Sequence, residues 1–120
     1  VGEKNYGGEM VRFVIQTTRK TVPVVLVNAS RGKVVRAEPV AALYEQGRVC
    51  HVVPESDEDG RVIDNPLAEL EEEMRLTGST GYLGDGSPNR MDALVWALTD
   101  LMLGPHALFT WNVNGEEIAA

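Results

Sequence analysis

The sequence predicts an α/β fold with at least part of a parallel sheet, and three observations lead to that class. Stretches whose apolar residues recur at helical spacing alternate with short β-branched runs. Cap residues, prolines and glycines mark where the helices start and stop. The resulting order is strand, helix, strand, helix, strand, helix, helix, which is typical of strands joined by helical crossovers.

Three strands are predicted. The chain opens on what looks like the end of a strand at 1–3, and β-branched runs follow at 21–28 (TVPVVLVN) and 48–53 (RVCHVV). Sheets usually have about four to six strands, so this sheet is thin. We expect the chain to be the later part of a larger domain whose first strands lie upstream or come from a partner. Residues 54–64 are a predicted loop, and residues 77–86 are predicted to be a loop or an extended segment.

Four stretches have helical periodicity. In the first, Met10, Phe13 and Val14 share a face. Because proline suits a first turn better than a helix interior, the second helix is expected to begin near Glu38 or to be kinked at Pro39. Asn65 and Ser87 are expected to cap the third and fourth helices, each with a proline directly after it. The four stretches are 9–20, 33–47, 66–76 and 88–103.

Length and charge restrict the kind of protein. The 120 residues suffice for a single domain, 1–120, with one modest core. Residues 1–53 carry eight basic and four acidic side chains, and residues 54–120 carry three and fourteen. The net charge of −7 argues against a nonspecific nucleic-acid binder, although the first half could still present a basic face to phosphate. Solvated helix faces explain the same charges equally well.

Several familiar sites are absent from the sequence. No P-loop, dinucleotide fingerprint or serine-nucleophile motif occurs. His51 and His106 have no partner at zinc-ligand spacing. The single Cys50 is expected to be a small apolar residue within a strand. The acidic runs at 57–59 and 71–73 are expected to be a solvated loop and a solvated helix face.

The fourth helix contains an acid that two interpretations can explain. Met91 and Val95 belong to its apolar stripe, and Asp92 lies at the edge of that stripe, one turn from the N-terminus. Acids are favoured there by the helix dipole, which accounts for Asp92 without any ligand. An edge carboxylate can also face a crevice beside the sheet and bind a ligand.

Glu3 is a second candidate, since it stands at a strand end before KNYGG. Acids at the carboxyl ends of parallel strands face the crevice in which α/β proteins bind ligands. The two glycines fit either a close ligand or a tight strand-to-helix turn.

Three stretches together resemble a known family. GEKNYGGEMV, RGKVVRAEPVAALYEQGRV and GSPNRMDALVWAL stand in the same order as in the large terminase subunits of tailed bacteriophages and related prophages. The chain resembles their C-terminal nuclease domain. The resemblance implies an RNase H-like mixed sheet with flanking helices, lacking its first strands in this chain. It also implies a metal-dependent endonuclease that cuts concatemeric viral DNA during packaging.

The resemblance also implies site residues. The family holds two Mg²⁺ or Mn²⁺ ions with acids, one in an E-x-N-x-G-G motif that corresponds to Glu3 and one in the last helix that corresponds to Asp92. This chain starts after a further acid of the family, so we expect the chain alone to cut weakly or not at all. The family often has Asp where Asn89 stands. The basic residues Arg31, Lys33 and Arg36 become candidates for holding the DNA backbone.

The same resemblance implies binding partners and a cellular location. Partners would be double-stranded DNA, the terminase small subunit and the portal, in the cytoplasm of the bacterial host. Without a Walker motif the chain is not expected to bind ATP, and no apolar run is long enough for a membrane helix. The alternative is a non-catalytic binding or assembly module of the packaging machinery, which would use the acidic second half as a contact surface.

Overall fold

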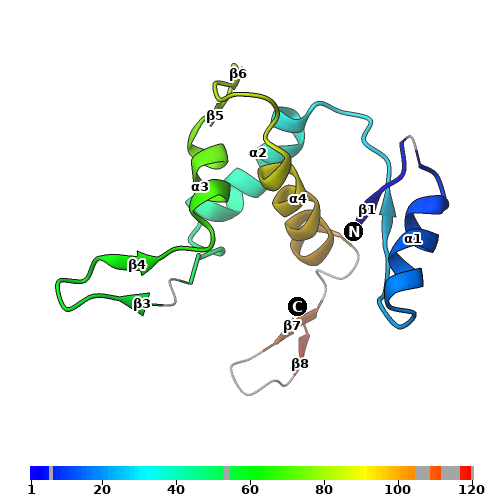
Figure 1. Ribbon diagram of the computed structural model, residues 1–120, viewed down its shortest axis with the longest axis horizontal. Coiled ribbons are helices and arrows are strands. Elements are labelled where there is room, and N and C mark those ends of the chain that lie inside the picture. The colour runs from blue at the N-terminus through cyan, green and yellow to red at the C-terminus, as the bar shows by residue number, and fades with distance from the viewer. Residues whose placement is uncertain (6, 53–54, 105–108, 112–116, 120) are drawn as a thin grey trace. The chain divides into compact units, whose positions relative to one another are not determined.

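A computed structural model describes residues 1–5, 7–52, 55–104, 109–111 and 117–119. Its residues form two compact units (Figure 1). We call residues 33–95 the central unit, and residues 1–32 together with 96–120 the terminal unit. The predicted mixture of helices and strands is confirmed, whereas the further strands of the expected sheet and the single domain stay predictions. Among the described residues, no helix is both long and apolar enough to cross a bilayer.

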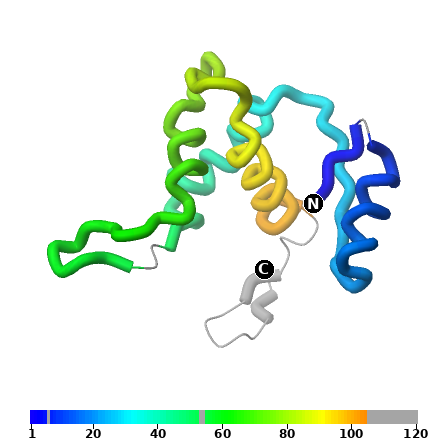
Figure 2. The backbone as a smooth tube through the Cα atoms, in the orientation of Figure 1, coloured from blue at the N-terminus to red at the C-terminus, as the bar shows by residue number. Residues whose placement is uncertain are grey.

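The terminal unit contains a parallel strand pair joined by a helix. Strands β1 (Gly2–Glu3) and β2 (Leu26–Val27) pair in parallel, with Glu3 opposite Val27. Helix α1 (Met10–Thr18) connects them and lies beside the pair (Figure 2). A Cβ atom at Gly2 would lie only 2.9 Å from Val11 Cγ1, so glycine permits this close approach. The predicted parallel crossover is therefore present, although its strands are shorter than expected.

Helix α1 packs on β1 with a different side from the one its apolar pattern indicated. Val11 and Ile15 face Gly2, whereas Met10, Phe13 and Val14 are more than half exposed. Apolar residues occur on both sides of this short helix, so periodicity alone did not identify the side that packs.

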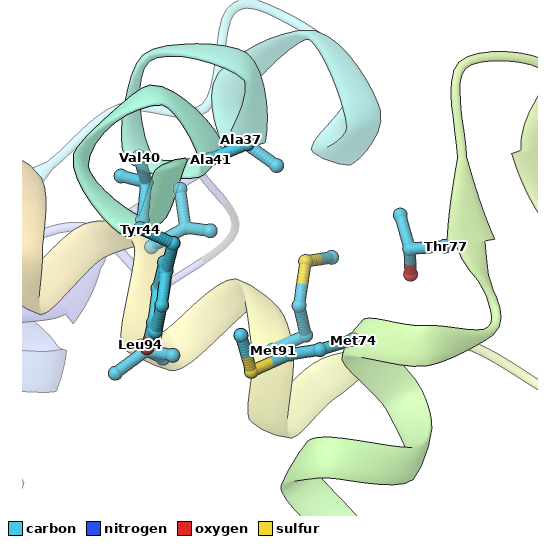
Figure 3. A pocket seen from close by; sticks show the side chains of 9 residues that line it. Ala37, Val40, Ala41, Tyr44, Met74, Thr77, Met91 and Leu94 are labelled. Atoms are coloured by element: carbon cyan, nitrogen blue, oxygen red, sulfur yellow. The ribbon is translucent and has the colours of Figure 1, made fainter. Parts of the chain in front are cut away.

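Three helices build the central unit. They are α2 (Lys33–Glu45), α3 (Ala68–Arg75) and α4 (Asn89–Leu98), the last of which continues as a π-helical turn at Thr99–Leu103. Their buried apolar core consists of Val40, Leu43, Met91 and Val95. Beside this core lies an apolar cavity of about 100 Å³, lined by side chains of all three helices (Figure 3).

Helix α2 decides between the alternatives expected at Pro39. It starts at Lys33 and runs through Pro39, so of the two alternatives the start near Glu38 is wrong, and the kink at Pro39 stays a prediction. A proline in the interior leaves the carbonyl of Val35 without its usual N–H donor. Val35 is exposed, so water can reach that region of the helix. This early start places Lys33 and Arg36 on the same helix as the core residues.

Two antiparallel hairpins occur, one in the segment predicted as a loop at 54–64 and one in the segment predicted as a loop or extended at 77–86. Strands β3 (Glu55–Ser56) and β4 (Val62–Asp64) form one hairpin, and β5 (Thr77–Gly78) and β6 (Gly81–Tyr82) form the other. A third antiparallel pair, β7 (Phe109–Trp111) with β8 (Glu117–Ala119), belongs to the terminal unit.

The strand predicted at 48–53 is wrong for the residues described there. Residues 48–52 have no strand assignment, Val52 is 82% exposed, and Cys50 is also exposed. A strand requires a neighbouring strand to receive its backbone hydrogen bonds. Among the described residues no strand pairs with this segment; its first N–H, on Arg48, donates to the Leu43 carbonyl of α2 instead. Residue 53 and His106 lie outside the described residues.

Candidate functional site

Asp92 is buried in the first turn of α4, where a guanidinium from α2 covers its carboxylate. The Arg36 Nη2 donates to both carboxylate oxygens at 2.8 Å, and its Nε lies 3.3 Å from Oδ1. The two side chains are only 8% and 11% exposed, for Asp92 and Arg36 respectively. A charge-assisted contact with more than one hydrogen bond is strong in such a setting. Asp92 is therefore a buried acid that ties α4 to α2.

A second cation lies on the same carboxylate. The Lys33 Nζ donates to Ser87 Oγ at 2.7 Å and to Asn89 Oδ1 at 2.5 Å, and it lies 3.9 Å from Asp92 Oδ2. We call these five residues the Lys33 cluster: Lys33, Arg36, Ser87, Asn89 and Asp92. The structure thus brings together three of the site residues that the sequence indicated. Two cations face one carboxylate, and the starts of α2 and α4 add further positive partial charge.

Glu3 belongs to the terminal unit, at the carboxyl end of β1. Just beyond it, the Asn5 side chain bridges the two loops that follow the parallel strands. Asn5 Nδ2 donates to the Ala29 carbonyl at 2.9 Å, and the Ala29 N–H donates to Asn5 Oδ1 at 2.8 Å. An open polar hollow lies here, lined by Asn5, Asn28, Ala29 and Ser30. This is the strand end at which α/β folds bind ligands, and the exposed Arg31 follows directly.

One comparison with known proteins identifies the family. The family model of the terminase RNase H-like domain matches residues 2–101, which is most of the chain. The chain belongs to this family. Searches of curated proteins and of solved structures found no match. A terminase RNase H-like domain is a nuclease-type domain of the DNA-packaging machinery, so the resemblance read from the three sequence stretches is confirmed.

The oxygen atoms beside Asp92 are of the chemical types that bind a divalent metal ion. Ser87 Oγ, Asn89 Oδ1 and an oxygen of Asp92 all converge on the Lys33 ammonium. Oxygen donors of these types are the ligands that Mg²⁺ and Mn²⁺ prefer, so the residues fit a hard cation. Among the described residues of each unit, no group of three or more His, Cys, Asp or Glu side chains is arranged so that it could hold a metal ion. The Lys33 cluster therefore offers one carboxylate and two neutral oxygens.

Glu73 is a structural residue of this region that the sequence did not reveal. It was expected on a solvated helix face, yet it is only 8% exposed. Its Oε2 accepts the backbone N–H of Met91 at 2.9 Å, and its Oε1 accepts from Arg90 Nη1 at 3.2 Å. Burial raises the pKa of Glu73, but these hydrogen bonds and the charge of Arg90 lower it more. The sequence alone does not show which glutamate of the run Glu71–Glu73 caps another helix, because all three positions carry the same residue.

His51 also has a role that the search for zinc ligands missed. Its Nε2 lies 2.8 Å from Tyr44 Oη, and its Nδ1 lies 2.7 Å from Glu71 Oε1. Asn65 Nδ2 donates to the other oxygen of Glu71 at 2.7 Å. We call Tyr44, His51, Asn65 and Glu71 the His51 network. It attaches the segment after α2 to α3, and the β-branched run around His51 gave no sign of it.

Proposed function

We propose that this terminase domain is a metal-dependent DNA endonuclease that cuts concatemeric viral DNA during genome packaging. One observation carries the proposal most directly. Asp92 is buried at the start of α4 and surrounded by oxygen donors and cations from α2 and the segment before α4. A buried carboxylate with several charged partners is expensive to maintain and is typical of functional sites. Membership of the terminase family supplies the reaction class.

The proposed roles follow from the chemistry of each side chain. Glu3 and Asp92 are proposed to hold Mg²⁺ or Mn²⁺ in a two-metal site, and such ions activate a water molecule and stabilise the leaving oxygen. Arg31, Lys33 and Arg36 are proposed to hold the DNA backbone through charge, which gives weak sequence preference. The terminase small subunit, the portal and the host cytoplasm complete the proposed setting.

Plasmid cleavage tests the two acids. The full-length gene product that contains this chain would be incubated with supercoiled plasmid and Mn²⁺, and nicking would be followed on a gel. We expect Glu3→Gln and Asp92→Asn each to reduce the rate about a hundredfold or more, since losing even an outer partner of a metal ligand costs up to that factor. Asp59→Asn removes an exposed acid in the β3–β4 turn and serves as the control.

The outcomes separate the two functions. Cleavage that survives in both acid variants at the parent rate would contradict the assignment of Glu3 and Asp92. Metal-dependent cleavage that is absent in the parent, combined with retained DNA binding, would favour the non-catalytic assembly module.

A further inference from the structure

The oxygens of the Lys33 cluster have the geometry of a small cation site that is already filled. Ser87 Oγ, Asn89 Oδ1 and Asp92 Oδ2 come from one short stretch at the start of α4 and surround the Lys33 Nζ at 2.7, 2.5 and 3.9 Å. An ammonium has three donors and no acceptor, and here it occupies the Ser87 and Asn89 oxygens with hydrogen bonds while its charge faces the Asp92 carboxylate.

We propose that the Ser87, Asn89 and Asp92 oxygens form a cation site whose resident cation is the Lys33 ammonium, and that a divalent ion enters only by displacing Lys33. This inference rests on the proposed metal role of Asp92. It assigns Lys33 as a positioning residue, because it holds the oxygens together until a metal ion replaces it.

Both charge repulsion and the available space require that the Lys33 ammonium leave when a divalent ion binds. Two cations already face the single carboxylate of the cluster. A divalent ion added beside them would be strongly repelled over a few ångströms in a partly buried site. An ion bound to Ser87 Oγ and Asn89 Oδ1 at roughly 2.0–2.2 Å would also compete for space with the ammonium, which lies 2.7 and 2.5 Å from the same two oxygens.

The exposed fractions of the Lys33 and Arg36 side chains indicate which of these two residues leaves Asp92 when a divalent ion binds. The Lys33 side chain is 30% exposed, whereas that of Arg36 is 11% exposed and contacts both Asp92 oxygens. Lysine has a flexible stem and a strongly hydrated charge, so it can move into water at modest cost. Arg36 therefore stays on Asp92 while Lys33 moves. The displaced ammonium is then available to a phosphate of the DNA backbone.

The affinity of the full chain for Mn²⁺ tests the inference without any cleavage assay. Binding would be measured by electron paramagnetic resonance of free Mn²⁺ for the parent and for Lys33→Gln. We expect Lys33→Gln to bind Mn²⁺ about tenfold tighter or more, since one unit charge has been removed at close range. Lys20→Gln removes the same charge from an exposed position and should leave the affinity unchanged. Adding Asp92→Asn to Lys33→Gln should abolish the gain.

Unchanged or weaker Mn²⁺ binding by Lys33→Gln, with the helix content of the parent retained, would overturn the inference. If that variant loses helix content, Lys33→Met keeps the aliphatic stem and repeats the measurement under the same criterion. A gain in affinity that persists after Asp92→Asn would overturn it as well. The proposed nuclease function is judged separately: a parent protein that cleaves no DNA would contradict that function, while tighter Mn²⁺ binding by Lys33→Gln that depends on Asp92 would still support the exchange at Lys33.

Discussion

At the scale of single residues, the His51 network shows how hydrogen bonds set the charge state of a side chain. A carboxylate only accepts, so the His51 Nδ1 carries the proton toward Glu71. The hydrogen bonds from His51 and Asn65 lower the pKa of Glu71. Partial burial and the nearby charge of Glu71 raise the pKa of Tyr44. The two shifts extend the pH range over which Glu71 is ionised to lower pH and the range over which Tyr44 is neutral to higher pH.

The lowered pKa of Glu71 makes stability depend on pH with a definite sign. The folded state binds the Glu71 proton less tightly than the unfolded state, so the contribution is fully present above the ordinary glutamate pKa of about 4.3. It is lost as pH falls through the lower, folded value. In a carboxyl NMR titration we expect the Glu71 midpoint to lie below the ordinary value and to rise in His51→Gln. Equal midpoints in the parent and in His51→Gln would show that His51 does not stabilise the ionised carboxylate.

At the scale of elements, the Glu73 carboxylate on α3 caps the start of α4. The first N–H groups of a helix lack partners within the helix, and Glu73 on α3 accepts one of them, the N–H of Met91 on α4. The negative charge also lies at the positive end of the α4 dipole. Since Asp92 is the next residue along the chain, the same contact fixes the backbone from which Asp92 reaches Arg36.

Removing the charge of Glu73 should therefore weaken the packing of α3 against α4. We expect Glu73→Gln to lower the free energy of unfolding by about 1–3 kcal/mol, the usual cost of breaking a buried charge-assisted hydrogen bond. Urea denaturation followed by circular dichroism measures the change. Glu72→Gln is the matched control, because Glu72 is half exposed and pairs with Arg75 on its own helix. Similar losses in the two variants would argue against a special role for Glu73.

The hairpin β3–β4 shows at the same scale what local chemistry can specify. Asp57 Oδ1 accepts the backbone N–H groups of Asp59 and Arg61, and Gly60 has a positive φ of 77°. The Asp-Gly pair before a β-branched run is a turn signal. The turn signal lies within the loop predicted at 54–64, and the two short strands on either side of it are what that prediction lacks.

At the scale of the whole molecule, the charges are divided along the chain. The first 53 residues carry an excess of basic side chains, whereas the remainder is strongly acidic. In the structure, Lys33 and Arg36 neutralise Asp92, and Arg90 neutralises Glu69 and Glu73. Some of the basic excess is therefore used within the central unit, which leaves Arg31 as the proposed DNA contact outside the Lys33 cluster.

The salt dependence of DNA binding tests that assignment. Each phosphate contact releases condensed counterions, so the logarithm of the binding constant falls linearly with the logarithm of the salt concentration. We expect Arg31→Gln to reduce the steepness of that line by about 0.9 for duplex DNA, the contribution of one contact. Fluorescence anisotropy over a salt series measures it. Arg61→Gln in the acidic hairpin is the comparison, and an equal reduction there would point to net charge rather than to a contact at Arg31.

The sequence by itself determined the family, the α/β class, the parallel crossover at the start of the chain and the helix that carries Asp92. These follow from local patterns: caps and prolines mark helix starts, β-branched runs favour strands, and three ordered motifs identify terminase domains. The start of α4 illustrates it, because Ser87 and Pro88 predicted a boundary within a residue or two of Asn89.

The tertiary structure alone decided which charged residues meet. Lys33 and Asp92 are far apart in sequence, and no local pattern indicates that α2 and α4 bring the Lys33 ammonium to Ser87, Asn89 and Asp92. The same holds for Glu73 at Met91 and for the segment at 48–52, which has strand composition but no neighbouring strand. Periodicity reports which face of an element is apolar, whereas burial, ion pairing and strand pairing depend on the elements packed against it.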